Sequence, residues 1–321
     1  MRTAIYFLAG LCFLAACAVQ AAEAPYPNRP IRLIVPFPPG GGTDIVARVI
    51  ALKATETLLQ TVVVDNRAGG GGTMGAETVV RAHPDGYTLA MVSASYSTNP
   101  ALYKLPYDPA KDIQAIVMVG SSGWVLVLNP GVPLKSVQEL VAYNKANPAR
   151  LNYGSTGTGG ATHLATELFD LLAGTRMTHI PYKGTGPALN DLIGGQIQVM
   201  FGAMPSAIPQ VKGGRLRAIG VTTLKRVASL PDVPAIQETV PGYEAVTWYG
   251  VLGPKGLPRN VVAAWNREVA RILQTDDMKS RMAVEAIEPA GGPPEQFLNV
   301  IRRDIEKWTK VVQAAKITLG N

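Results

Sequence analysis

Apolar runs of strand length alternate with segments of helical periodicity in the first third of the chain. Residues 31–35, 62–64 and 87–92 are the apolar runs. Between them, residues 43–50 repeat apolar positions three and four apart, and residues 74–82 form a second predicted helix. Strands and helices in this order, with short connections, predict a parallel sheet with helices on its faces.

The same alternation returns in the middle of the chain. Predicted strands cover residues 116–128, 151–153, 179–182, 199–201 and 216–221. Helical segments follow several of these strands, so the middle of the chain forms a second β/α set.

The C-terminal part contains one more predicted strand, residues 247–253, and then two long amphipathic helices, residues 260–274 and 294–315. These helices have no sheet of their own. We therefore expect the end of the chain to return to the first β/α set and to pack there.

The predicted fold is α/β, with two doubly wound lobes and a cleft between them. Lobe 1 would comprise residues 22–124 and 248–321, and lobe 2 residues 125–247. A length of 321 residues suits two cores better than one. Two chain crossings, near Trp124 and Trp248, would form a hinge.

The N-terminus has the pattern of a secretory signal peptide. Arg2 precedes an apolar stretch over residues 4–18, and small residues then lead to a cleavage site after Ala21. We expect residues 1–21 to be removed on export to the periplasm. In an alternative interpretation, residues 14–17 form a lipobox and Cys17 carries a lipid anchor. Both cysteines of the chain lie in this leader, so we expect no disulfide in the mature protein.

The composition of the chain excludes several classes of protein and of binding partner. Hydrophobic residues make up 47% and charged residues 17%, which excludes a disordered chain. The net charge of +7 comes from scattered basic residues, so we expect no nucleic-acid partner. His83, His163 and His179 are widely spaced, and we expect neither a metal site nor a cofactor.

Three segments share the order strand, Gly/Ser/Thr loop, helix: residues 38–44, 154–162 and 182–187. Such loops direct backbone N–H groups and a helix N-terminus at one point, which binds anions without an arginine. One such loop alone is most often a tight turn, but three of them favour a binding site. Their hydroxyls would come from Thr43, Ser155 and Thr185, with Thr43 also capping the first helix.

The glycine-rich segments of this sequence do not match the common enzyme motifs. A dinucleotide-binding fingerprint requires a third glycine where Ile45 stands, and a P-loop requires lysine where Thr43 follows Gly42. The glycine before Ser155 is misplaced for a hydrolase elbow. Two alternatives stay open: an exported α/β enzyme acting on a small carboxylate or its ester through Ser155 and His163, and an envelope protein without a ligand.

Residues 26–44, YPNRPIRLIVPFPPGGGTD, resemble the opening signature of the Bug receptors, the solute-binding components of tripartite tricarboxylate transporters. Further matches extend the resemblance over nearly the whole mature chain: VDNR with the glycine run to Gly72, PDGYTL at 84–89, NPALY at 99–103, YGS at 153–155, HLA at 163–165 and PYKG at 181–184.

The resemblance implies a periplasmic, type II periplasmic binding protein fold. It implies a carboxylate ligand held by amides, hydroxyls and waters, for delivery to a membrane permease or for signalling, and we expect a monomer. By matching motif, the implied ligand-binding residues are Pro39, Gly41, Gly42, Thr43, Asp44, Ser93, Ser95, Ser155, Thr156, Gly157, Thr185, Gly186, Phe201 and Met204.

Two of these residues carry a second interpretation, and a residue next to Ser95 departs from the family pattern. Asp44 is more often a first-turn residue that favours the helix dipole than a ligand contact. As a functional residue it would accept an N–H or O–H from the solute, or a loop amide. Phe201 is more typical of a core than of an aromatic wall. Tyr96 departs from the family pattern and is expected to narrow the pocket.

Overall fold

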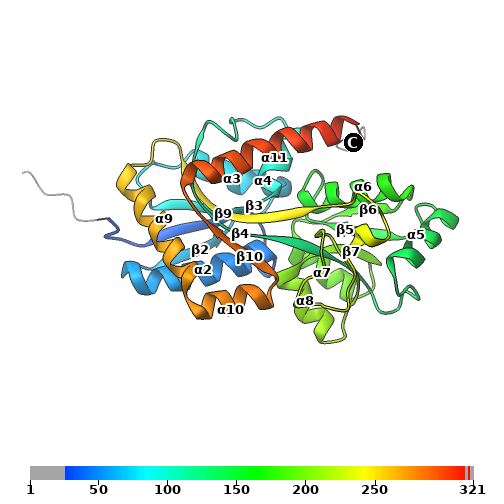
Figure 1. Ribbon diagram of the computed structural model, residues 1–321. Coiled ribbons are helices and arrows are strands. Elements are labelled where there is room, and N and C mark those ends of the chain that lie inside the picture. Colours follow the sequence, from blue (N-terminus) through cyan, green and yellow to red (C-terminus); the bar gives the residue numbers. More distant parts are fainter. Residues whose placement is uncertain (1–25, 315–316, 319–321) are drawn as a thin grey trace, which may run out of the picture.

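The computed structural model describes residues 26–314, 317 and 318 (Figure 1). The strands are β1 (Ile31–Val35), β2 (Val62–Asn66), β3 (Thr88–Ser93), β4 (Ile113–Leu128), β5 (Asn152–Ser155), β6 (Thr178–Pro181), β7 (Val199–Ala203), β8 (Arg217–Val221), β9 (Val246–Pro254) and β10 (Ile287–Gly291). The predicted signal peptide and Cys17 lie outside the described residues.

Helices cover the faces of the sheets, as the alternating pattern predicted (Figure 1). They are α2 (Gly42–Leu58), α3 (Thr73–Val80), α4 (Ser95–Thr98), α5 (Val137–Ala146), α6 (Ala161–Ala173), α7 (Thr185–Ile193), α8 (Met204–Lys212), α9 (Arg259–Gln274), α10 (Asp276–Val284) and α11 (Pro294–Ala314). In the part of the chain that is described, none of them is long and apolar enough to cross a membrane.

Each half of the molecule has a parallel set of strands. In the first half β1 pairs in parallel with β2 and β3, and in the second half β5 pairs in parallel with β6 and β7. The halves are joined through antiparallel strands, so the order runs β2-β1-β3-β9-β4-β7-β5-β6. This is the two-lobed α/β architecture expected from the sequence, with antiparallel strands added where the chain crosses.

Strand β4 belongs to both halves. Residues 113–123 pair with β9 in the first half, and residues 124–128 pair with β7 and β8 in the second. Strand β9 starts at Val246, directly opposite Gly123. The chain therefore crosses between the halves at Gly123–Trp124 and again just before Val246. The exact lobe boundaries stay a prediction.

The C-terminal segment packs on the first half, where α9 contacts α2 and α11 contacts α4 (Figure 1). The expectation that it brings no strand was wrong, because β10 pairs antiparallel with β4. Ile287 is the only buried residue of β10, and Pro289 lacks an N–H for the ladder. An edge strand of this kind has no alternation for a sequence pattern to reveal.

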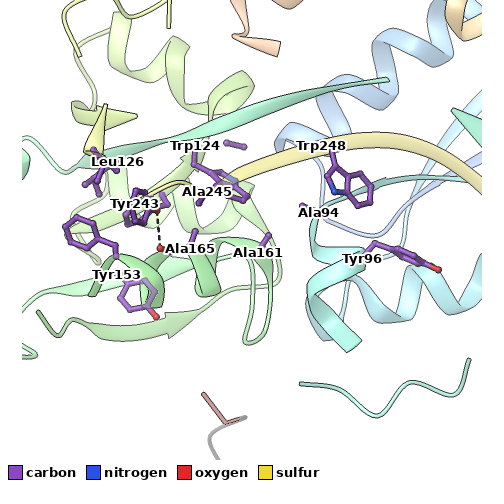
Figure 2. Packing of buried hydrophobic residues seen from close by; sticks show 14 of the residues in the cluster. Ala94, Tyr96, Trp124, Leu126, Tyr153, Ala161, Ala165, Tyr243, Ala245 and Trp248 are labelled. Atoms are coloured by element: carbon purple, nitrogen blue, oxygen red, sulfur yellow. Dashed lines mark hydrogen bonds between the residues drawn. The ribbon is translucent and has the colours of Figure 1, made fainter. Parts of the chain in front are cut away.

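The core beside the crossing is aromatic. Figure 2 shows Trp124 and Tyr243 on the side of the second half, and Trp248 near Tyr96 on the side of the first. Trp248 meets the ring of Phe297 edge-on at 5.2 Å, and its Nε1 donates to Asp304 at 2.7 Å. Helix α11 is thereby attached to the crossing strand β9.

Phe297→Ala should lower the free energy of unfolding by about 3–5 kcal/mol, because this side chain is buried and its loss leaves a cavity against Trp248. Val284→Ala is the control: Val284 is 59% exposed, and its loss should cost less than about 0.5 kcal/mol. Urea unfolding followed by fluorescence measures both, and equal losses would contradict the packing described here.

Candidate functional site

A small cavity of about 30 Å³ lies between the two halves of the molecule. Both halves and the crossing strands contribute to its wall: Phe37, Gly41, Gly42, Thr43, Ser93, Ser95, Trp124, Thr156, Ala161, Thr162, Thr185, Ala203, Thr247 and Tyr249. Seven of these residues are among those inferred from the sequence: Gly41, Gly42, Thr43, Ser93, Ser95, Thr156 and Thr185.

The N-terminus of α2 forms one wall of the cavity. Gly41 is the N-cap residue of this helix, so the expectation that Thr43 caps it was wrong. A Cβ at Gly42 would stand 2.7 Å from the hydroxyl of Tyr249 and 2.9 Å from the Cβ of Ala203, so only glycine fits there. Because Thr43 does not cap the helix, its hydroxyl is available to the cavity.

Hydroxyl groups dominate the polar part of the wall. Thr43, Ser93, Thr185, Thr247 and Tyr249 all line the cavity, and within the described residues none of their side chains has a hydrogen-bond partner. Burial raises the pKa of Tyr249, which keeps its hydroxyl protonated as a donor.

None of the residues in the wall carries a charge. An anion here would be held by hydroxyls and by the backbone N–H groups at the start of α2. Among the described residues, no group of three or more His, Cys, Asp or Glu is placed to hold a metal ion.

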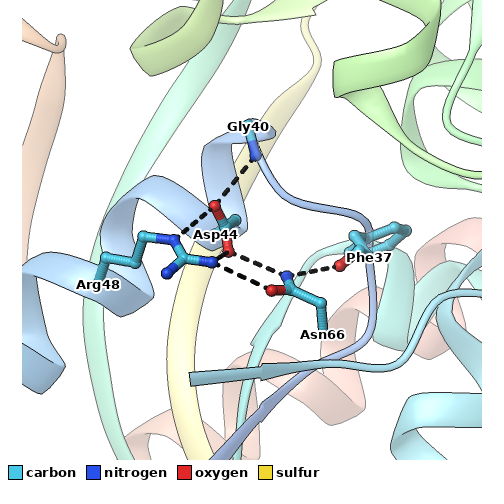
Figure 3. A network of polar contacts seen from close by, with 5 residues as sticks. All are labelled: Phe37, Gly40, Asp44, Arg48 and Asn66. Carbon is cyan, nitrogen blue, oxygen red and sulfur yellow. Dashed lines mark hydrogen bonds and ion pairs between the residues drawn. The ribbon is translucent and has the colours of Figure 1, made fainter. Parts of the chain in front are cut away.

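Asp44 fixes the loop that precedes α2 (Figure 3). Its carboxylate accepts from Gly40 N at 3.0 Å, from Arg48 Nε and Nη2 at 2.9 Å each, and from Asn66 Nδ2 at 2.9 Å. Burial alone would raise the pKa of Asp44, but these hydrogen bonds hold it below the usual value. Asn66 Nδ2 also donates to Phe37 O at 2.8 Å. Asp44 does not line the cavity, and the geometry matches its interpretation as an acceptor for a loop amide.

Ser155 lies behind the wall, fully buried. Its Oγ is 2.6 Å from Nε2 of His179 and accepts the N–H of Gly157 at 3.1 Å. His179 stacks on His163 with 4.0 Å between ring centroids, and His163 Nδ1 accepts the N–H of Gly159 at 3.1 Å. The serine therefore pairs with His179 and not with His163, and its hydroxyl does not line the cavity.

The other residues inferred from the sequence lie elsewhere. Pro39 and Gly186 meet where the halves touch: a Cβ at Gly186 would be 2.6 Å from Pro39 O. Gly157 lies in the loop after β5, next to Gly71 of the first half. Phe201 is buried against Phe169 with 5.8 Å between centroids, as its core interpretation predicted. Met204 is buried in the core between β7 and α8.

Three hydrogen bonds join the halves around the cavity. Tyr103 donates its hydroxyl to Thr158 O at 2.6 Å, and Thr98 donates to Gly159 O at 3.0 Å. Ala161 N, at the start of α6, donates to Ser95 Oγ at 3.2 Å. The loop over residues 157–161 is thus held against the first half, and the molecule is in a closed arrangement.

The sequence-based reasoning missed seven residues of the wall: Phe37, Trp124, Ala161, Thr162, Ala203, Thr247 and Tyr249. The sequence pattern could have identified two of these seven residues. Thr247 and Tyr249 are two apart on a predicted strand beside a predicted crossing, so they share one face. Ala161 and Thr162 lie in the predicted loop over residues 154–162 but were not singled out, and Ala203 contributes a small surface that no motif marks.

The free energy of unfolding should fall as the pH drops from about 6.5 toward 4. Burial lowers the pKa of His163 to about 4 and that of His179 to about 3, despite Glu167 Oε1 lying 3.8 Å from His163 Nε2. In this window the unfolded chain binds more protons than the folded one, so acid favours unfolding by up to about 1.4 kcal/mol per pH unit for each histidine.

Urea unfolding at pH 7 and pH 4.5 tests this expectation. The variant with both His163→Gln and His179→Gln is the control, because other groups also titrate in acid. The loss between the two pH values should be smaller in this variant, and an equal loss would exclude the histidines as its source.

Comparison with known proteins agrees with this geometry. The model of the tripartite tricarboxylate transporter family receptor matches residues 46–317. Protein BugT of Bordetella pertussis is 37% identical over 303 residues, 93% of each chain.

Two solved structures extend the comparison. Rpa4515 of R. palustris with adipate has a TM-score of 0.89 at 35% identity, covering 91% of this chain and 99% of that one. MatC from Rhodopseudomonas palustris with bound malate has a TM-score of 0.85 at 31% identity, covering 89% and 100%. The chain belongs to the family of tripartite tricarboxylate transporter receptors.

Proposed function

We propose that this chain is a periplasmic receptor, without catalytic activity, that encloses a small carboxylate between its two halves. The cavity wall carries this proposal. A helix N-terminus and five hydroxyls without a hydrogen-bond partner among the described residues converge from both halves, and none of the described residues that line the space is charged. Related proteins of the family have been solved with adipate and malate. In the closed arrangement the ligand is surrounded by donors.

The remaining parts of the proposal rest on the sequence and on the family resemblance. The receptor acts as a monomer and delivers its ligand to a membrane permease or to a signalling partner. It reaches the periplasm through the leader at residues 1–21, or is anchored there by lipid on Cys17. The proposed site includes the residues that line the cavity, with Pro39, Gly157 and Gly186 serving the contact between the halves.

Thermal shift assays with a panel of C3–C6 mono- and dicarboxylates test the function. At least one acid should raise the melting temperature, because a ligand present at 100 times its Kd stabilises the folded state by about 2.7 kcal/mol. Chromatography of the same samples should show no product. Hydrolysis of a carboxylate ester that disappears in Ser155→Ala would instead support an enzyme built on Ser155 and His179.

The second test asks which groups hold the carboxylate. In Gly41→Val the new side chain would meet Thr185, since a Cβ there already stands 3.4 Å from Thr185 Cβ. We expect roughly tenfold to hundredfold weaker binding, because the carboxylate loses hydrogen bonds of about 1.5–3 kcal/mol. Thr43→Ala removes one hydroxyl and should weaken binding roughly threefold to tenfold.

Lys183→Ala is the matched control. Lys183 is exposed, does not line the cavity and is adjacent to the Gly184 loop. Its loss should change the affinity less than about threefold if N–H and O–H groups hold the anion. Calorimetric titration of folded variants measures all three. Binding abolished in Lys183→Ala but intact in Gly41→Val would place the anion on a point charge in the second half.

A further inference from the structure

A second, smaller pocket lies behind Phe37. It shares Phe37, Ser93 and Ser95 with the main cavity and reaches inward to Asn99 and the glycine run that precedes α3. Its space admits one group of about the size of a water molecule. The two spaces are therefore neighbours separated by one aromatic ring and two serines.

Asn99 places an unsatisfied acceptor in this pocket. The residue is 2% exposed, and its Nδ2 donates to Gly71 O at 3.2 Å, which sets the orientation of the amide. Its Oδ1 is buried and has no hydrogen-bond partner among the described residues. Gly71 has a φ of +63°, and a Cβ there would stand 3.3 Å from this oxygen, so the glycine keeps the approach to Oδ1 open.

The chemistry of the pocket selects what can enter it. Ser95 Oγ accepts the N–H of Ala161, and its own O–H remains available to donate. Asn99 Oδ1 can only accept. A second carboxylate would face the lone pairs of Oδ1, whereas a hydroxyl or an amino group would satisfy them.

We propose that this pocket is a subsite for a hydrogen-bond donor on the ligand, so the receptor prefers hydroxy or amino acids over the unsubstituted acid. The inference rests on the proposed function, since it concerns the same ligand. The wall offers an acceptor in Asn99 Oδ1 and hydroxyls in Ser93 and Ser95, next to the donors that would hold the carboxylate.

Matched pairs of acids with equal carbon number test the subsite by calorimetric titration. Lactate and alanine are each compared with propionate, and malate and aspartate with succinate. In at least one pair the native protein should bind the substituted acid about tenfold more tightly. The hydroxy and amino members distinguish the two kinds of donor.

Asn99→Leu removes the acceptor and should abolish this preference, while the affinity for the unsubstituted acid changes less than about threefold. Ser97→Ala is the control, because Ser97 Oγ is also buried without a hydrogen-bond partner among the described residues but does not line the pocket. This variant should keep the preference. If Asn99→Leu does not fold, Asn99→Asp retains the size, and its added charge should shift the preference toward the amino acids.

Three results would overturn the inference. Equal affinities in every pair would mean that the pocket holds only an ordered water. Equal weakening of both members by Asn99→Leu would assign Asn99 to positioning the glycine run through Gly71. In either case the proposed function stands as long as the unsubstituted acids bind. If no carboxylate binds to the native protein, the proposed function fails together with the subsite.

Discussion

The pairing of β4 with β9 is the constraint on which the remaining structure depends. These two antiparallel strands lie side by side from Ile113 to Gly123, and β4 then continues into the second sheet. Both halves are therefore built on one continuous strand, which fixes how they face each other. Trp124, Thr247 and Tyr249 enter the cavity wall because they lie on these strands at the crossing.

Neutral donors suit a wall that the two halves of the molecule form together. A buried arginine in this wall would have to be desolvated, and an unpaired buried charge is costly. Backbone N–H groups and hydroxyls carry a much smaller desolvation cost. The charged residues next to the loop that precedes α2 are Asp44 and Arg48, and they form an ion pair outside the cavity wall. This pair keeps the loop in its conformation without contacting the cavity.

The sequence was most informative where local chemistry determines the structure. Gly41, Gly42 and the hydroxyls of Thr43, Ser93, Ser95 and Thr185 were all identified as parts of a site, and they do line the cavity. Local reasoning located the strand-to-helix loops well, because each loop follows directly from the pattern on either side of it.

The rest depended on tertiary contacts that no local pattern contains. Ser155 was inferred as a site residue, but the fold turns its hydroxyl toward His179, which is 24 positions away in the sequence. Phe201 faces the core because β7 is buried on both faces. β10 was missed because it pairs through backbone groups alone, and Thr43 was wrongly placed as a cap because Gly41 takes that position.

Contacts between the halves and contacts with a ligand both stabilise the same closed arrangement. The three hydrogen bonds between the halves are each worth about 0.5–1.5 kcal/mol, so they contribute only modestly to holding the halves together. A ligand that contacts both walls would add to this free energy and favour the closed arrangement over a more open one. Two of these bonds end on the backbone carbonyls of Thr158 and Gly159, whose loop is held by Ser155 and His163 from behind. The buried histidine pair therefore shapes the loop surface that contacts the first half, although neither histidine lines the cavity.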